Sequence, residues 1–332
     1  MEHALQSAKE LLEMREVFSL KDSPEERRWE LFQPSGGGPG MILPALLPGH
    51  LFRGQNKRYR PCRSKLARYL APGDHQIPQR SVSDQARIAE LIARRLWFLK
   101  ELEGHPASKW MKTRGLDRFP MPLAQHYGVP TGYIDLTESF DVACFFATCY
   151  EDPDRKWHPC TTGSGVIYML PTAQLRFGLD MVHPIGLQPF ARPRVQWGWV
   201  GVVGTNDDFE RVSTLQIYEF RHDRSVSEYF LNAFGEGTHL FPLDPLAQAA
   251  ETAMTSAVIP LARLDRIIED MRADPRGLTI SASEVYQALA ERGITAGEAP
   301  VLFSPEQLAV LEKEWIADLN LIYETSPLRP DR

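Results

Sequence analysis

Residues 123–149 read LAQHYGVPTGYIDLTESFDVACFFATC and contain the clearest helix–strand–helix signal of the chain. A short helix is expected to end at Gly128, because a residue without a Cβ suits a left-handed cap, and Pro130 prevents the helix from continuing. Residues 131–137 are rich in β-branched and aromatic side chains, which favours a strand. Ser139 can then cap a second helix with one apolar side.

Polar side chains gather at both ends of this expected strand. Two interpretations stay open, because such residues either surround a binding site or only close turns and cap the next helix. The residues concerned are Gln125, His126 and Tyr127 before the strand, and Asp135, Thr137, Glu138 and Ser139 at its end.

Composition places the chain among globular proteins. It has 332 residues, 43% hydrophobic and 24% charged, with a net charge of −6 that disfavours non-specific binding of nucleic acid. Its four cysteines show no CxxC pair for a metal, which suggests a reducing compartment. The N-terminus has no basic segment followed by an apolar run, and no apolar run approaches a membrane span. We therefore expect a cytoplasmic protein that does not bind membranes.

Arg53 follows an apolar lead, Leu51-Phe52, in what we expect to be an inner strand. A buried arginine is costly unless it meets an anion. Two alternatives are therefore left open. The guanidinium binds a phosphate or carboxylate of a ligand, or it pairs with Asp135 or another acid of the chain.

Residues 57–68 form a basic cluster with tyrosines but without an acidic residue. Such a segment can follow a nucleic-acid backbone or hold the phosphates of a dinucleotide. A solvated loop is the other interpretation.

The remaining pattern predicts an α+β protein, because strands gather after residue 130 without regular alternation with helices. We expect a helical segment at 1–44, a core at 45–245 and a helical region at 246–332. Residues 105–120 are expected to form a connector. The expected helices are 4–18, one that starts at Ser23, 83–103, 225–234, 258–271, one capped by Ser281 and one capped by Ser304; the expected strands are 165–171, 195–203 and 215–221.

Four short motifs in this order resemble the FRG domain family, which is named for a Phe/Tyr-Arg-Gly motif. They are Phe52-Arg53-Gly54-Gln55, the segment from Gln125 to Thr131, the segment from Asp135 to Ser139 together with that from Ala143 to Ala147, and Arg192 followed by Gln196-Trp197-Gly198. The resemblance covers roughly residues 45–205. Two positions depart from the family pattern: Gly132 stands where an arginine is usual, and Leu136 where a tryptophan is usual.

The order of these motifs is similar to that of ADP-ribosyltransferases, which implies a split β-sheet core with flanking helices. It also implies NAD as substrate. By this resemblance Arg53 and Gly54 belong to the phosphate or ribose site, with Thr137 and Ser139 in support. His126 and Tyr127 then bound the nicotinamide pocket, and Gln196 occupies the position of the usual glutamate.

Cleavage of the bond to nicotinamide passes through an oxocarbenium-like sugar, which a carboxylate stabilises. Gln196 carries no charge, so Glu138 or Glu228 is the candidate for that role. We therefore expect catalysis by Arg53, Gln196 and Glu138. The acceptor is a protein or nucleic acid, in a toxin or phage-defence effector with a possible regulatory partner protein. The alternative is a non-catalytic nucleotide-binding or protein-interaction module.

Overall fold

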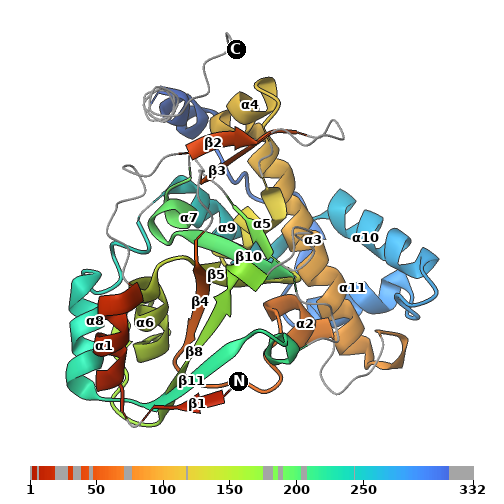
Figure 1. Ribbon diagram of the computed structural model, residues 1–332. Helices are drawn as coiled ribbons and strands as arrows, with labels where there is room; N and C mark the ends of the chain where they lie inside the picture. The colour runs from red at the N-terminus through yellow and green to blue at the C-terminus, as the bar shows by residue number, and fades with distance from the viewer. Residues whose placement is uncertain are drawn as a thin grey trace.

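In a computed structural model of the chain, β4 (His50–Gln55) lies in the middle of the largest sheet (Figure 1). The FRG-like arginine is therefore on an inner strand, as its apolar lead predicts. The described residues are 2–5, 7–18, 29–32, 39–44, 48–70, 77–116, 119–174, 182–185, 190–202, 208–242 and 244–313.

Seven described strands form this mixed sheet, in the order β1-β11-β8-β4-β5-β10-β9. β1 (Glu2–Ala4) pairs in parallel with β11 (Gln216–Arg221), so the N-terminal segment contributes an edge strand. The other neighbours are antiparallel. A mixed sheet with many helices makes this an α+β protein.

The sheet opens between β4 and β5 (Tyr133–Thr137). β4 pairs along its whole length with β8 (Ser164–Pro171), and β5 does so with β10 (Gly198–Val202). Between β4 and β5, however, the described ladder is the single pair Phe52–Thr137. The two halves of the sheet are thus joined at one point and leave space between the remaining backbones.

One face of the sheet is covered by α6 (Phe140–Thr148), α1 (Lys9–Phe18) and α8 (Arg224–Ala233), as Figure 1 shows. Gly54 allows α6 to lie directly on β4, because a Cβ there would be 1.7 Å from the backbone oxygen of Ala143. Phe52 packs into this layer, whereas Leu51 packs on the opposite face with Leu136. This alternation is the period of two expected of a strand.

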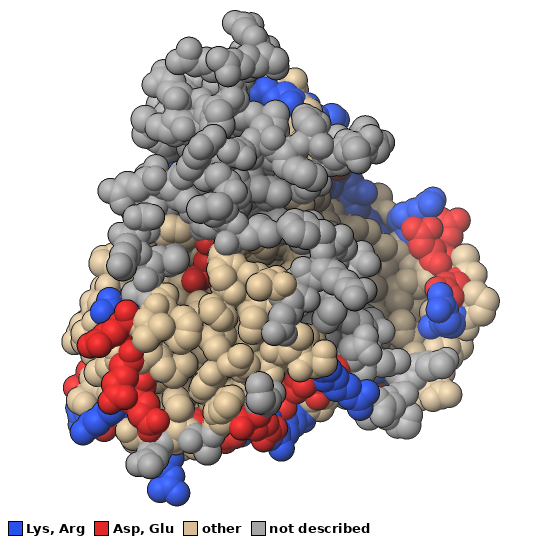
Figure 2. Space-filling view, in the orientation of Figure 1, with Lys and Arg blue, Asp and Glu red and all other residues tan. Residues whose placement is uncertain are grey.

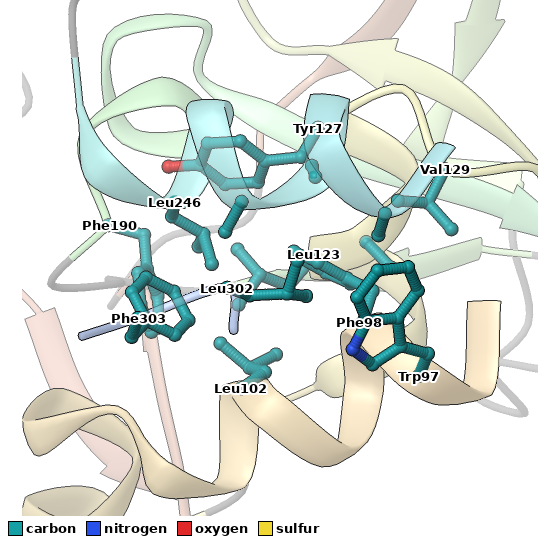
Figure 3. Packing of buried hydrophobic residues seen from close by; sticks show 14 of the residues in the cluster. Trp97, Phe98, Leu102, Leu123, Tyr127, Val129, Phe190, Leu246, Leu302 and Phe303 are labelled. Atoms are coloured by element: carbon teal, nitrogen blue, oxygen red, sulfur yellow. The ribbon is translucent and has the colours of Figure 1, made fainter. Parts of the chain in front are cut away.

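The helical C-terminal part of the chain packs against the long helix α3 (Val82–Gly104). α9 (Pro245–Thr255), α10 (Leu261–Ala273) and α11 (Ala282–Ala290) pack against it. In Figure 3, Phe98 and Leu102 of α3 interdigitate with side chains from α5 (Pro120–His126) and α9 and with Phe303. Because Tyr127 belongs to the same cluster, this core reaches the site described below.

The other elements are short. They are β2 (Trp29–Phe32), β3 (Met41–Pro44), α2 (Lys65–Leu70), η2 (Ile77–Gln79), α4 (Pro106–Thr113), α5 (Pro120–His126), β6 (Cys149–Glu151), β7 (Trp157–Pro159), η3 (Thr172–Gln174), β9 (Val182–Pro184), α7 (Ala191–Val195), η4 (Phe209–Arg211), β12 (Val258–Pro260) and β13 (Thr295–Gly297).

Several expected elements differ in the structure. The connector at 105–120 contains α4, because Pro106 occupies the first turn and His105 caps it. The strand expected at 195–203 starts at Gly198, after the one-turn helix α7, and Trp197 between them has φ 50°. Residues 258–260 form β12 before α10, where we expected one helix.

Some predictions lie outside the described residues. The helix expected from Ser23 begins outside them, before β2 at Trp29–Phe32, and the helix capped by Ser304 is described only as far as residue 313. On the face seen in Figure 2, described acidic and basic side chains are mixed along the lower edge. Across the described residues we find no helix with the length and apolar character needed to cross a membrane.

Candidate functional site

A cavity of about 440 Å³ lies at the opening between β4 and β5. β4 provides one wall and β5 the other, so the single ladder pair at Phe52 and Thr137 closes one end of the gap. α2, the end of α5 and the turn after α7 complete the walls. Lining residues include Arg53, Arg63, Lys65, Arg68, Gln125, His126, Tyr127, Asp135, Thr137, Arg192 and Gln196.

Arg53 bridges the two walls. Its Nη1 donates to the backbone oxygen of Asp135 at 2.8 Å, while its buried Nε has no hydrogen-bond partner among the described residues. Within the described chain Arg53 forms no ion pair, so its positive charge is not neutralised by the Asp135 carboxylate. Of the two alternatives left open by the sequence, the geometry favours the one in which a ligand supplies the anion.

A directional chain of hydrogen bonds fixes Asp135. The Thr131 hydroxyl donates to Oε1 of Gln125 at 2.6 Å, which turns the Gln125 amide nitrogen toward Asp135. That nitrogen donates to Asp135 Oδ2 at 3.1 Å. The carboxylate is thus held from behind, with its side chain 46% exposed.

A second chain fixes His126. Gln196 Nε2 donates to the backbone oxygen of Leu240 at 2.9 Å, so its Oε1 faces Nδ1 of His126 at 3.1 Å. Gly198 leaves room for the imidazole, since a Cβ there would be 2.7 Å from Cε1 and 2.8 Å from Nε2 of His126. The Nε2 atom is 3.9 Å from Asp135 Oδ1.

Tyr127 is buried under Arg192. The guanidinium of Arg192 lies 4.9 Å from the Tyr127 ring centroid and 5.2 Å from that of Phe241. The Tyr127 hydroxyl donates to Asp244 Oδ2 at 2.8 Å. Burial lowers the pKa of Arg192 and raises that of Tyr127, in the latter case together with the Asp244 charge. At this wall the Arg192 guanidinium is therefore backed by the buried Tyr127 ring.

Positive charge dominates the cavity. Six basic residues line it, with only the acidic residues Asp135 and Glu151 among the described lining, and Glu151 pairs with Arg155 at 3.0 Å. The excess of cations stands out in a chain with a net charge of −6. Such a cavity attracts an anion with more than one negative charge.

The basic cluster at 57–68 is divided between two roles. Arg58 forms structural ion pairs with Glu2, Glu210 and Glu219. The hydrogen bond to Glu210 is the main cause of the raised pKa of Arg58. Further along, Arg63, Lys65 and Arg68 line the cavity, and Lys65 also donates to the Gly128 oxygen at 3.1 Å. The cluster is therefore neither a solvated loop throughout nor a uniform binding segment.

The structure brings most predicted site residues together. Arg53, Gly54, His126, Tyr127, Thr137 and Gln196 all line the cavity.

Thr137 donates to the Gln196 backbone oxygen at 2.7 Å and so holds the turn after α7 against β5. Ser139 caps α6 through Val142 N and is not among the lining residues, which is a structural role.

Glu138 and Glu228 are not among the residues that line the cavity. Glu138 is buried and accepts a hydrogen bond from Trp199 Nε1 at 2.5 Å, while Glu228 pairs with Arg224 on the surface of α8. Asp135 takes their place as the acidic group of the site. The sequence did contain a signal for it, because Asp135 is the first residue of a matched motif and lies on the expected strand.

Asp244 and Phe241 are site residues that sequence reasoning missed. They approach Tyr127 and Arg192 from more than 45 positions away, and no local motif marks them. Gly132 has no atoms within 4 Å of an added Cβ, so space does not explain why this chain lacks the usual arginine there. Among the described residues, no group of three His, Cys, Asp or Glu side chains could hold a metal ion.

Fold and site together define an α+β protein whose sheet opens around a cation-lined cavity. Residues 49–156, about a third of the chain, match the FRG domain family, so this part of the chain is an FRG domain. The match contains both walls of the opening but not Arg192 or Gln196. No curated protein and no solved structure gives a significant match to the chain.

Proposed function

We propose that this protein is an ADP-ribosyltransferase-like enzyme that uses NAD and modifies a protein or nucleic-acid acceptor. The observation that carries the proposal is the opening between β4 and β5, with Arg53 across it and an excess of cations around it. A toxin or phage-defence effector is the setting that we propose for such an activity.

The cavity suits a dinucleotide. Its volume of about 440 Å³ is within the usual range of small-molecule sites. Arg53 and the basic residues of the 63–68 segment would hold the pyrophosphate, since guanidinium groups bind phosphate oxygens in pairs. The wall formed by Tyr127 and Arg192 would receive a planar ring.

The reaction needs positioning and charge rather than a redox group. Cleavage of the bond between ribose and nicotinamide leaves positive charge on the sugar, which a fixed carboxylate stabilises. Asp135 is the group in place for this, since Gln125 orients its carboxylate and nearly half of its side chain is exposed.

A non-catalytic nucleotide-binding module is the second candidate. It is favoured by Gln196, whose amide is occupied at both ends by His126 and Leu240 and carries no charge. In that case the cavity would bind a nucleotide without breaking it, and the helical C-terminal part would be the surface for a partner.

The experiment compares the wild type with Arg53→Gln. NAD binding is measured by calorimetry, nicotinamide release by chromatography, and transfer by labelled NAD in a cell lysate. Arg53→Gln should weaken NAD binding about tenfold or more, because one charge-assisted phosphate contact is lost. Arg224→Gln is the matched control, since Arg224 is exposed on α8 and pairs with Glu228.

Each outcome decides between the candidates. Nicotinamide release that Arg53→Gln reduces would support the enzyme. NAD binding without nicotinamide release or label transfer would favour the binding module. A wild-type protein that neither binds NAD nor releases nicotinamide would exclude the enzyme.

A further inference from the structure

Two hydrogen-bond chains converge on one carboxylate and one imidazole in the cavity wall. From one side Thr131 and Gln125 hold Asp135, and from the other Leu240 and Gln196 hold His126. The facing atoms, Asp135 Oδ1 and His126 Nε2, are 3.9 Å apart, and both are buried without a hydrogen-bond partner in the described part of the chain. Polar atoms left in this state at the centre of an ordered network call for an explanation.

The second chain fixes the proton on the imidazole. An amide oxygen can only accept a hydrogen bond, and the amide nitrogen of Gln196 is directed to a carbonyl. Nδ1 of His126 must therefore carry the hydrogen that Gln196 Oε1 accepts. The neutral imidazole is left with its lone pair on Nε2, which faces Asp135.

We infer that Asp135 and His126 form the proton-accepting pair of the site, that Gln196 is its positioning residue, and that the acceptor of ADP-ribose reacts through a hydroxyl group. This inference rests on the proposed function. A hydroxyl needs a base when it attacks, whereas the buried lone pair of an imidazole has no use if the acceptor is already an anion.

The step balances as follows. The acceptor oxygen bonds to C1′ of the ribose, the bond from C1′ to nicotinamide breaks, and its electron pair neutralises the pyridinium nitrogen. The acceptor proton passes to the Asp135 carboxylate and then to Nε2 of His126, which becomes an imidazolium beside a restored carboxylate. For the second transfer the gap of 3.9 Å must shorten by roughly 1 Å.

The nearby charges come from the elements packed around the pair. Arg192 of α7 donates to the His126 backbone oxygen at 3.4 Å, and Arg53 of β4 donates to the Asp135 backbone oxygen. β10 contributes Gly198, which has no side chain, and the Asp244 carboxylate accepts the hydrogen bond of the Tyr127 hydroxyl. Asp135 is therefore the acid that faces His126 among the described residues.

Nicotinamide release and formation of methyl ADP-ribose from NAD in buffered methanol provide the test, with methanol as the hydroxyl probe. Asp135→Asn should lower kcat by about 100-fold or more while the Kd for NAD changes less than about threefold. Asp270→Asn is the matched control, because its side chain is similarly exposed but lies on α10. If Asp135→Asn keeps kcat within threefold of the wild type, the inference is wrong; NAD cleavage by the wild type would still support the enzyme, but with a group other than Asp135 opposite the sugar cation.

Gln196→Glu tests the positioning role through the pH profile. A carboxylate next to Nδ1 stabilises the imidazolium, so the acidic limb of the kcat profile should move up by about one pH unit. If Gln196→Glu is active and the acidic limb of its kcat profile does not move, Gln196 does not act by positioning His126.

A measurement without substrate keeps the two proposals separable. In histidine-labelled wild-type protein, long-range proton–nitrogen NMR spectra should show neutral His126 protonated at Nδ1. Protonation at Nε2 would overturn the inference whatever the activity. If the wild type neither binds NAD nor releases nicotinamide, the proposed function and the catalytic step fail together, and these spectra still decide whether Gln196 fixes the tautomer.

Discussion

Gly198 illustrates how one missing side chain shapes the site. It is the glycine of the Gln-x-Gly motif, and the imidazole of His126 occupies the space that a Cβ would need. Gly198 does not have a positive φ, so the backbone conformation does not require a glycine at this position. The motif therefore couples two tasks: Gln196 holds the imidazole on one side, and Gly198 makes room for it on the other.

Gly198→Ala should displace His126, because contacts of 2.7–2.8 Å to Cε1 and Nε2 are shorter than carbon atoms tolerate. We expect nicotinamide release to fall by about tenfold or more, with a loss of stability of about 1–3 kcal/mol. Enzyme assays and urea unfolding measure the two effects. Gly132→Ala, where a Cβ meets nothing within 4 Å, is the control. Wild-type activity in Gly198→Ala would show that the imidazole position does not matter.

At the scale of elements, α3 is tied to the C-terminal helices by a buried charge cluster. Glu90, 1% exposed, accepts hydrogen bonds from Arg87, Arg94 and Arg292. Burial would raise the pKa of Glu90, but the arginines outweigh it and hold the pKa below its ordinary value. Arg94 also donates to the backbone oxygens of Ala253 and Ser256 at the end of α9.

Glu90→Gln should therefore destabilise the protein by about 3–5 kcal/mol, because Arg94 would remain as a buried cation without an anion. Urea denaturation followed by circular dichroism measures this loss. The control is Glu103→Gln on the same helix, where the pair with Lys100 is exposed and its loss costs less than about 1 kcal/mol. Similar urea midpoints for Glu90→Gln and Glu103→Gln would show that the buried charge cluster around Glu90 does not stabilise the fold.

At the scale of the whole molecule, His105 connects parts that are far apart in the chain. It caps α4 through Nδ1, which accepts from Ala107 N at 3.2 Å, and its ring packs against Phe190 and Phe303. Burial lowers its pKa from 6.5 to about 4. The folded protein thus keeps this imidazole neutral where the unfolded chain would protonate it.

The protein should lose stability in mild acid as a result. Above about pH 6.5 the His105 imidazole is neutral in both the folded and the unfolded chain, so it does not affect the free energy of unfolding. As the pH drops toward 4, the unfolded chain binds a proton that the folded protein does not, and the free energy of unfolding falls by about 3 kcal/mol in total. His105→Asn keeps a capping acceptor but cannot titrate, so its stability should vary less with pH in this window. Urea midpoints for both proteins between pH 7 and 4.5 measure the difference. Parallel curves would show that His105 is not responsible.

Most of the local structure could be predicted from neighbouring residues. The helix–strand–helix unit around Asp135 and the capping box at Ser281 depend on interactions within a few positions, and both are present in the structure. α7 was missed because a single helical turn before a strand leaves too little periodicity to recognise. Arg53 could be placed on an inner strand because its apolar neighbours mark burial.

The site itself needed the tertiary structure. Asp135, Gln196 and Arg53 are near one another because β4 and β5 separate after one pair, and no local pattern encodes where a sheet opens. The same holds for the exclusion of Glu138, since the side to which a residue at a strand end turns depends on its partner, here Trp199. Local chemistry thus specified the elements and the candidate residues, whereas the pairing of distant strands selected which of them face the cavity.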